Sequence, residues 1–276
     1  MQHVEHLGRH ADALAHRHRD KLSMAASIGW AAKGALYVCL GVLAVMAAIG
    51  EGGAIMGKQG VLHWIASQPF GRVLLALAGI GFACYALWRF VEAIVDPHRH
   101  PDKKTMIAKR VGSAASGVLH AGLSVAAFQM LAGNSPGNGR HTWLAKAMSM
   151  GTGGVVLVCA LGVIAILVGL YQFKKAASLE FMDEVDRGRM SHREVSVLRA
   201  VGRAGYAARG VVLPVIGYFL IVAALARNPS AAKGTGGALG ALAQAGWWVL
   251  AIVAVGLTAY GILQLFFAKY RRVRLS

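Results

Sequence analysis

The repeated motif that decides the fold is Gly29-Trp-Ala-Ala-Lys-Gly34, which returns as Gly112-Ser-Ala-Ala-Ser-Gly117 and as Gly205-Tyr-Ala-Ala-Arg-Gly210. Each copy lies at the beginning of a long apolar run. Self-similarity of this kind is typical of a chain that uses one supersecondary unit several times. We therefore expect three copies of one unit.

A second motif follows each copy of the first at nearly the same distance. It reads Tyr85-Ala-Leu-Trp-Arg89-Phe in the first unit, Val168-Gly-Leu-Tyr-Gln172-Phe in the second and Tyr260-Gly-Ile-Leu-Gln264-Leu in the third. Each pair of motifs marks two successive apolar runs. Agreement in both motif and spacing predicts that the unit is a hairpin of two helices.

The composition indicates a membrane protein. Apolar residues make up 56 % of the 276 residues and charged residues only 15 %, against about 25 % charged residues in an average soluble domain. The 29 basic and 12 acidic residues give a net charge of +17. A basic protein that binds nucleic acid would not carry such long uncharged runs. The lipid bilayer is therefore the expected partner, and nucleic acid is not.

A helix that spans a bilayer needs about 20 consecutive, mostly apolar residues. Six runs meet this requirement, namely 27–50, 71–95, 111–133, 151–173, 205–226 and 245–268. We expect helices because lipid offers the backbone no hydrogen-bond partner, and because the runs lack the alternation of barrel strands. Three cysteines, Cys39, Cys84 and Cys159, fall within these runs at spacings that indicate neither a disulfide nor a metal site.

Basic residues concentrate in alternate loops. Residues 1–26, 96–110, 174–204 and 269–276 hold most of the Lys and Arg, whereas the three intervening loops hold few. By the positive-inside rule, both termini are expected in the cytoplasm. Such a basic face attracts anionic lipids by about 1 kcal/mol per basic residue near the surface.

The expected organisation follows from these runs. A basic, His-rich amphipathic arm (1–26) precedes repeat 1 (27–98), repeat 2 (109–180), a cytoplasmic linker with a short helix (181–204), and repeat 3 with a basic tail (205–276). Each repeat has two spans, so all three share one orientation, and parallel repeats are related by an axis along the membrane normal. We predict an all-α integral membrane protein, a six-helix bundle with pseudo-threefold symmetry.

Several stretches resemble a known family. These are Gln68-Pro-Phe-Gly-Arg72, Tyr85-Ala-Leu-Trp88, Asp96-Pro97 and the three copies of the glycine motif. They are similar to the domain-of-unknown-function family numbered 1206, bacterial membrane proteins with three tandem pairs of spanning helices. The resemblance implies that architecture and a place in a bacterial inner membrane, and it brings no catalytic residues. Repeat 2 departs from the pattern, since Ser116 replaces a basic residue and Val168 replaces a tyrosine.

The first candidate site is a polar ring at the cytoplasmic end of the axis. Its members are Lys33, Arg89, Glu92, Gln172, Arg209 and Gln264. Lys33, Ser116 and Arg209 occupy one repeat position, and Glu92 lies one turn from Arg89, so it can pair with Arg89 or Lys33. Two interpretations stand. The residues are either interfacial anchors that extend to water, or a ring that holds anionic lipid headgroups or admits anions.

The second candidate lies at mid-membrane. His120 is near the middle of the third span, Ser124 follows one turn later, and the equivalent of His120 in repeat 1 is Tyr37. An imidazole there either relays protons or makes an interhelical hydrogen bond. Pro214 lies inside the fifth span and predicts a kink, either passive or part of a gate.

Outside the spans, five histidines crowd residues 1–18, and a solvated basic arm is favoured over a metal site. The sequence Ser191-His-Arg-Glu194 predicts a capping box that opens a short helix ending at Arg203. Short apolar runs at 61–66, 143–148 and 238–243 predict interfacial half-helices, with re-entrant pore helices as the alternative.

Two functions remain open. A small transport or channel-like module with a site on the axis is favoured, because repeats often meet at a transport site. The alternative is a non-catalytic protein that binds lipid or assembles with membrane-protein partners or with itself. An enzyme is not expected, since no nucleophile elbow, zinc motif, redox pair or paired intramembrane carboxylates occur. No cofactor and no metal are expected.

Overall fold

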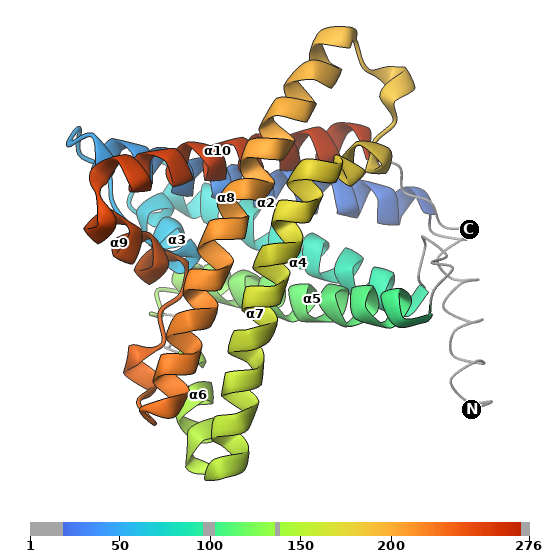
Figure 1. The fold of residues 1–276 in the computed structure, drawn as a ribbon. Helices are drawn as coiled ribbons and strands as arrows, with labels where there is room; N and C mark the ends of the chain where they lie inside the picture. The colour runs from blue at the N-terminus through green and yellow to red at the C-terminus, as the bar shows by residue number, and fades with distance from the viewer. Residues whose placement is uncertain (1–18, 96–102, 136–138, 272–276) are drawn as a thin grey trace.

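The computed structural model describes residues 19–95, 103–135 and 139–271 (Figure 1). These residues form six helices long and apolar enough to cross a membrane, which indicates a multi-pass membrane protein. They are α2 (Arg19–Ala48), α4 (Gly71–Val95), α5 (Lys103–Leu131), α7 (Thr152–Ser178), α8 (His192–Leu225) and α10 (Trp247–Tyr270). The prediction of an all-helical chain with six apolar spans is confirmed. Most of the His-rich arm lies outside the described residues.

Helix α8 begins earlier than the predicted span because of its N-terminal cap. The Ser191 hydroxyl accepts a hydrogen bond from the backbone N–H of Glu194, and the Glu194 carboxylate accepts one from the backbone N–H of Ser191. These bonds satisfy two N–H groups that a helix start leaves free. Nothing between Arg203 and Gly205 stops the helix, so the short helix and the span form one element.

One short helix lies between the two long helices of each repeat. These short helices are α3 (Lys58–Ala66), α6 (Gly139–Ser149) and α9 (Thr235–Ala245). All three contain the apolar runs noted in the sequence, and each buries part of its run, as Leu62, Leu144 and Leu239 show. The short 3-10 helices are η1 (Glu180–Glu184), η2 (Arg187–Arg189) and η3 (Pro229–Ala231).

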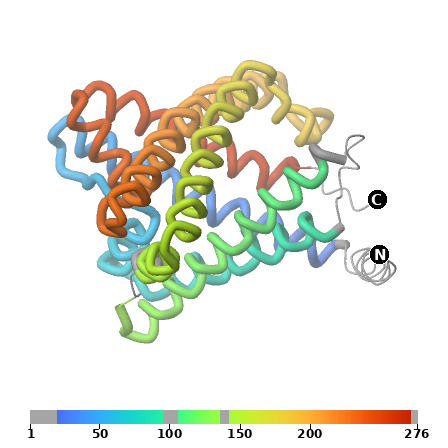
Figure 2. The backbone as a smooth tube through the Cα atoms, turned by 60° about the horizontal axis from the view of Figure 1, so that its bottom comes forward, coloured from blue at the N-terminus to red at the C-terminus, as the bar shows by residue number. Residues whose placement is uncertain are grey.

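The most extensive contacts join neighbouring repeats. They pair α4 with α5, α7 with α8, and α10 with α2 (Figure 2). Each interface uses the last glycine of the repeated motif. A Cβ added to Gly34, Gly117 or Gly210 would lie within 3 Å of the side chain of Leu265, Phe90 or Phe173, which occupy equivalent positions. Helices in lipid associate by such close approach, because the hydrophobic effect does not act between them there.

Contacts within the repeats differ. Helix α2 packs on α4 and α8 packs on α10, whereas α5 makes no comparable contact with α7. A Cβ on Gly29 would lie 2.6 Å from the Cα of Tyr85, and one on Gly205 would lie 2.6 Å from the Cα of Tyr260, but Gly112 has nothing within 4 Å. Helices α5 and α7 approach each other beside α6 and separate toward Lys103 and Ser178 (Figures 1 and 2). The packed hairpin therefore describes repeats 1 and 3.

Candidate functional site

Two basic side chains lie in the interior of the bundle, and each is held by a tyrosine. Lys33 is 6 % exposed, and its ammonium donates a hydrogen bond to the hydroxyl of Tyr85 at 2.8 Å. Arg209 is half-buried, and its guanidinium donates to the hydroxyl of Tyr260 at 2.5 Å. Lys33 and Arg209 occupy one repeat position, and Tyr85 and Tyr260 occupy another. Repeats 1 and 3 therefore build the same basic–tyrosine pair. Repeat 2 lacks both members, since Ser116 and Val168 stand there.

The two pairs form one cluster around Tyr260. The Lys33 ammonium is 5.5 Å and the Arg209 guanidinium carbon 4.6 Å from the centroid of the Tyr260 ring. Tyr37 packs edge-on against the same ring at 4.9 Å. A cation over an aromatic face is attracted by the quadrupole of the ring. Among the described residues, no carboxylate lies within salt-bridge distance of Lys33 or Arg209. We call Lys33, Arg209, Tyr85 and Tyr260 the interior cation cluster.

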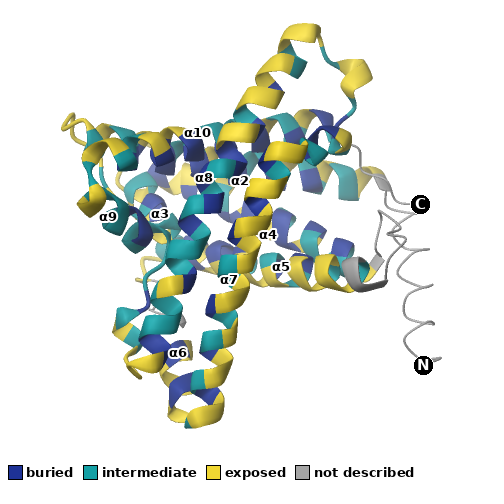
Figure 3. Ribbon diagram, viewed as in Figure 1, coloured by how far each residue is buried: buried dark blue, intermediate teal, exposed yellow. Residues whose placement is uncertain are grey.

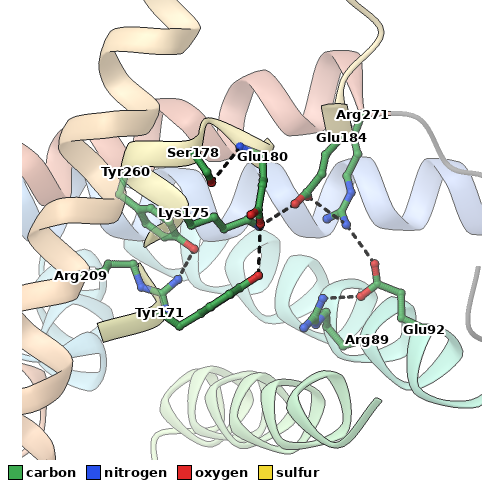
Figure 4. Close-up of polar contacts among 10 residues, drawn as sticks. All are labelled: Arg89, Glu92, Tyr171, Lys175, Ser178, Glu180, Glu184, Arg209, Tyr260 and Arg271. Atoms are coloured by element: carbon green, nitrogen blue, oxygen red, sulfur yellow. Dashed lines mark hydrogen bonds and ion pairs between the residues drawn. The ribbon is translucent and has the colours of Figure 1, made fainter. Parts of the chain in front are cut away.

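A second group is a chain of ion pairs at the end of the bundle where α7 and α10 terminate (Figure 4). Lys175 pairs with Glu184 at 2.6 Å, Glu184 with Arg271 at 3.4 Å, and Arg271 with Glu92 at 3.2 Å. Glu92 also pairs with Arg89. Three cations thus alternate with two carboxylates. The chain connects α7, η1, α10 and α4 in a single network.

Trp30 joins this ion-pair chain to the interior cation cluster. The Arg271 guanidinium carbon lies 4.4 Å from the centroid of the Trp30 ring, and the Lys33 ammonium lies 4.9 Å from it. The ring also packs edge-on against Tyr85 at 5.1 Å. Within the part of the chain that the structure describes, the buried indole N–H of Trp30 has no hydrogen-bond acceptor. It is therefore an unpaired donor at the junction of the two groups.

Several other buried polar atoms at this end have no hydrogen-bond partner in residues 19–95, 103–135 and 139–271. They are the Nε of Arg89, an Nη of Arg271, and both side-chain polar atoms of Gln264, which is fully buried. Buried polar groups are normally hydrogen-bonded. Most of these unpaired atoms are N–H donors, and donors gathered near basic side chains favour an anion.

The two predicted mid-membrane candidates of the third span, His120 and Ser124, lie on α5. A ring nitrogen of His120, Nδ1, lies 2.8 Å from the carbonyl oxygen of Ser116, and its Nε2 is buried without a hydrogen-bond partner among the described residues. The imidazole packs against Tyr85, with ring centroids 4.4 Å apart. Ser124 donates to the carbonyl of Gly79 at 2.8 Å. This last bond ties α5 to α4.

Pro214, which lies inside α8, packs against α7. The ring of Pro214 fills the notch that Gly169 leaves on α7, so that a Cβ on Gly169 would overlap it. The described residues hold no group of three or more His, Cys, Asp or Glu that would bind a metal.

The sequence matches the model of one protein family three times, over residues 28–96, 111–178 and 204–271. That family is described as Domain of Unknown Function (DUF1206). The chain belongs to the DUF1206 family. It is also similar to the Uncharacterized protein YxxB of Bacillus subtilis (strain 168), with 33 % identity over 238 residues, which cover 85 % of this chain and 86 % of that relative. No solved structure matches the chain.

In this DUF1206 protein, the structure places each residue of the predicted ring. Glu92 pairs with Arg89, one of the two alternatives, whereas Lys33 binds Tyr85. Gln172 and Gln264 are buried. The sequence did not indicate six of the partners in these contacts, namely Arg271, Glu184, Lys175, Trp30, Tyr85 and Tyr260. A signal existed for Tyr85 and Tyr260, because tyrosine recurs at one repeat position in the two repeats that carry the basic residue.

Proposed function

We propose that this protein binds an anionic group at the interior cation cluster and does so without catalysis. The observation that carries the proposal is the placement of Lys33 and Arg209 inside an apolar bundle, where their partners among the described residues are tyrosine hydroxyls and not carboxylates. Arginine stays protonated in proteins. A buried charge is costly unless it is paired, so an anion beside the guanidinium of Arg209 supplies the missing partner.

The surroundings support an anion over a cation or a neutral solute. The ion-pair chain next to the cluster has one positive charge in excess. Unpaired N–H donors of Trp30, Arg89 and Arg271 lie at the same end. Charge-assisted hydrogen bonds to an oxyanion are about twice as strong as neutral ones. A phosphate or carboxylate group matches this set of donors.

The test removes both charges while keeping the bulk of the side chains. We expect the double variant Lys33→Met/Arg209→Met to bind sn-glycerol 1-phosphate and phosphatidylglycerol at least about tenfold more weakly than the wild type, a change of about 1.4 kcal/mol. Isothermal titration of the soluble anion and native mass spectrometry of the lipid measure the two affinities. Apolar replacement of buried ionic groups is often neutral or stabilising, so we expect the variant to fold.

The matched control is Lys21→Met/Arg199→Met, which removes two exposed basic residues from the same helices, α2 and α8. We expect unchanged affinity for the soluble anion. Equal losses in both double variants would show that only total charge matters, and would overturn the assignment of the cluster. Wild-type protein that binds neither probe would overturn the proposal itself.

A transport or channel-like role is the second candidate, and one observation favours it. The interior cation cluster is formed where repeats 1 and 3 meet, through Lys33 and Tyr260, and repeat interfaces are common transport sites. Flux of chloride, phosphate, protons and potassium into liposomes tests this role. Flux that Arg209→Met, Arg89→Leu or His120→Ala abolishes would support transport. Anion binding without flux would leave a lipid-binding or assembly protein.

The orientation and membrane are part of the same proposal. Both termini face the cytoplasm of a bacterial inner membrane, because the loops at the ion-pair end are the basic ones. The three parallel repeats are arranged around a pseudo-threefold axis. Cysteine accessibility in cells tests the orientation, with a reporter at Glu51 in the first intervening loop and another at Arg189 in the basic loop after α7. Labelling of Arg189→Cys by an impermeant reagent would contradict it.

A further inference from the structure

Repeat 2 leaves an opening in the side of the bundle where the other repeats are closed. Leu36 and Val212 occupy one repeat position and are 2 % and 4 % exposed, whereas their equivalent Leu119 is 65 % exposed. On the facing helices, Tyr85 and Tyr260 are buried, while Val168 is 42 % exposed. The same positions that seal repeats 1 and 3 are therefore uncovered between α5 and α7.

The residues of repeat 2 explain why this interface stays open. Gly81 and Gly256 let α4 and α10 approach Ala32 and Ala208 closely, and Ile164 stands at the equivalent position of α7. A branched side chain in place of glycine keeps two helix backbones apart. Ile164 is itself 53 % exposed. Figure 3 shows the outward side of α7 as largely exposed along its length.

The opening is apolar at its walls and basic at its inner end. Gly112, Leu119 and Gly122 are exposed on α5, as Ile164 and Val168 are on α7. Among the described residues, a Cβ added to Gly112 or Gly122 would meet no atom within 4 Å. In Figure 4 the side chains of Arg89 and Arg209 lie on either side of Tyr171 of α7. Both residues remain partly exposed, Arg89 at 19 % of its side chain.

We propose that the opening between α5 and α7 is a lateral binding site for one anionic phospholipid. An acyl chain lies along the apolar walls, and the phosphate reaches Arg89 and Arg209. Burial of apolar surface favours the chain by about 25 cal/mol per Å² when it leaves water, but within a bilayer the charge of the headgroup decides the preference. An anionic diacyl lipid is the occupant that matches both parts of the opening.

This inference rests on the proposed function, and its test blocks the opening while leaving the cations in place. The variant Gly112→Trp/Gly122→Trp fills open space on α5 and removes two helix-destabilising glycines. We expect it to retain about tenfold less phosphatidylglycerol than the wild type in native mass spectrometry. Its affinity for sn-glycerol 1-phosphate should be within about twofold of the wild type, since a small anion needs no apolar groove.

The matched control is Val73→Trp/Leu77→Trp on α4, at two exposed apolar positions outside the opening. Phosphatidylcholine with the same acyl chains tests the charge preference, and we expect the wild type to retain less of it. Full retention of phosphatidylglycerol by the blocked variant would overturn lateral binding, and so would equal retention of the two lipids by the wild type. If the soluble anion still binds in that case, the interior cation cluster stands without the lateral route.

Discussion

Repeats 1 and 3 of this protein are closed and basic inside, whereas repeat 2 is open and lacks the basic–tyrosine pair. The two differences concern the same residues. The backbones of Tyr85 and Tyr260 pack closely against Gly29 and Gly205 of the other helix of the hairpin. Their hydroxyls accept hydrogen bonds from Lys33 and Arg209. Val168 offers neither a hydroxyl nor a packed partner. One tyrosine position therefore serves closure of the hairpin and charge accommodation together.

The comparison also shows what holds α7 in place. Without packing on α5, α7 contacts α8 and is tied to α4 and α10 through the ion-pair chain. Glu92 and Lys175, two members of that chain, occupy equivalent repeat positions and carry opposite charges. The polar chain thus takes over, at one end of the bundle, a connection that helix packing makes in the other repeats.

The largest effect is expected from breaking this chain at Glu92. Glu92→Gln leaves Arg271, whose side chain is 7 % exposed, and Arg89 without their shared carboxylate. Removing one partner of a buried pair costs about 3–5 kcal/mol. Thermal unfolding in detergent measures the loss. The control is Glu180→Gln, which removes an exposed pair with Lys174 and should cost about 0–1 kcal/mol. Equal shifts for the two variants would show that the chain does not hold α7.

A smaller effect is expected from testing closure directly with glycine substitutions. Gly205→Leu places a side chain against the backbone of Tyr260 and should destabilise by about 1–3 kcal/mol or more, because packed backbones cannot move apart cheaply. Gly112→Leu, at the equivalent position in repeat 2, meets open space and should leave the unfolding temperature unchanged or slightly higher. Similar destabilisation of both variants would mean that repeat 2 closes as the others do.

The next effect isolates the tyrosine hydroxyl from the packing of its ring. Tyr260→Phe keeps the edge-on contact with Tyr37 but removes the oxygen that accepts from Arg209. A polar group left unpaired in the interior costs about 1–3 kcal/mol. Tyr218→Phe, at an exposed position on α8, is the control and should be neutral. A bound anion beside Arg209 reduces the cost of losing the hydroxyl. We therefore expect the unfolding temperatures of Tyr260→Phe and Tyr218→Phe to converge when phosphatidylglycerol is added. Equal effects without lipid would contradict the role of the hydroxyl.

The sequence predicted the features that repeat and missed those that pair across repeats. The glycine motif and the apolar run lengths were enough for six spans, and α4 begins and ends at the predicted residues. The sequence showed Ser116 and Val168 as departures from the repeat. Their consequence, an uncovered interface between α5 and α7, also involves Ile164, which stands where the other repeats have a glycine. The pairing of Arg271 with Glu92 joins residues 179 positions apart, and no local pattern reports such a contact.

The smallest perturbation comes from measuring the distance between the two long helices of a hairpin in repeats 1 and 2. Ile28 and Leu87 in repeat 1 are equivalent to Val111 and Leu170 in repeat 2, and all four are exposed. Cysteines at each pair, in a chain whose Cys39, Cys84 and Cys159 are changed to alanine, carry spin labels. Exposed substitutions usually change stability by less than about 0.5 kcal/mol, so the labels report the resting arrangement. Pulsed electron resonance should give a longer separation for residues 111 and 170 than for residues 28 and 87. Equal separations would restore three alike hairpins and remove the opening, whereas a broad distribution in repeat 2 that phosphatidylglycerol narrows would show that lipid occupies it.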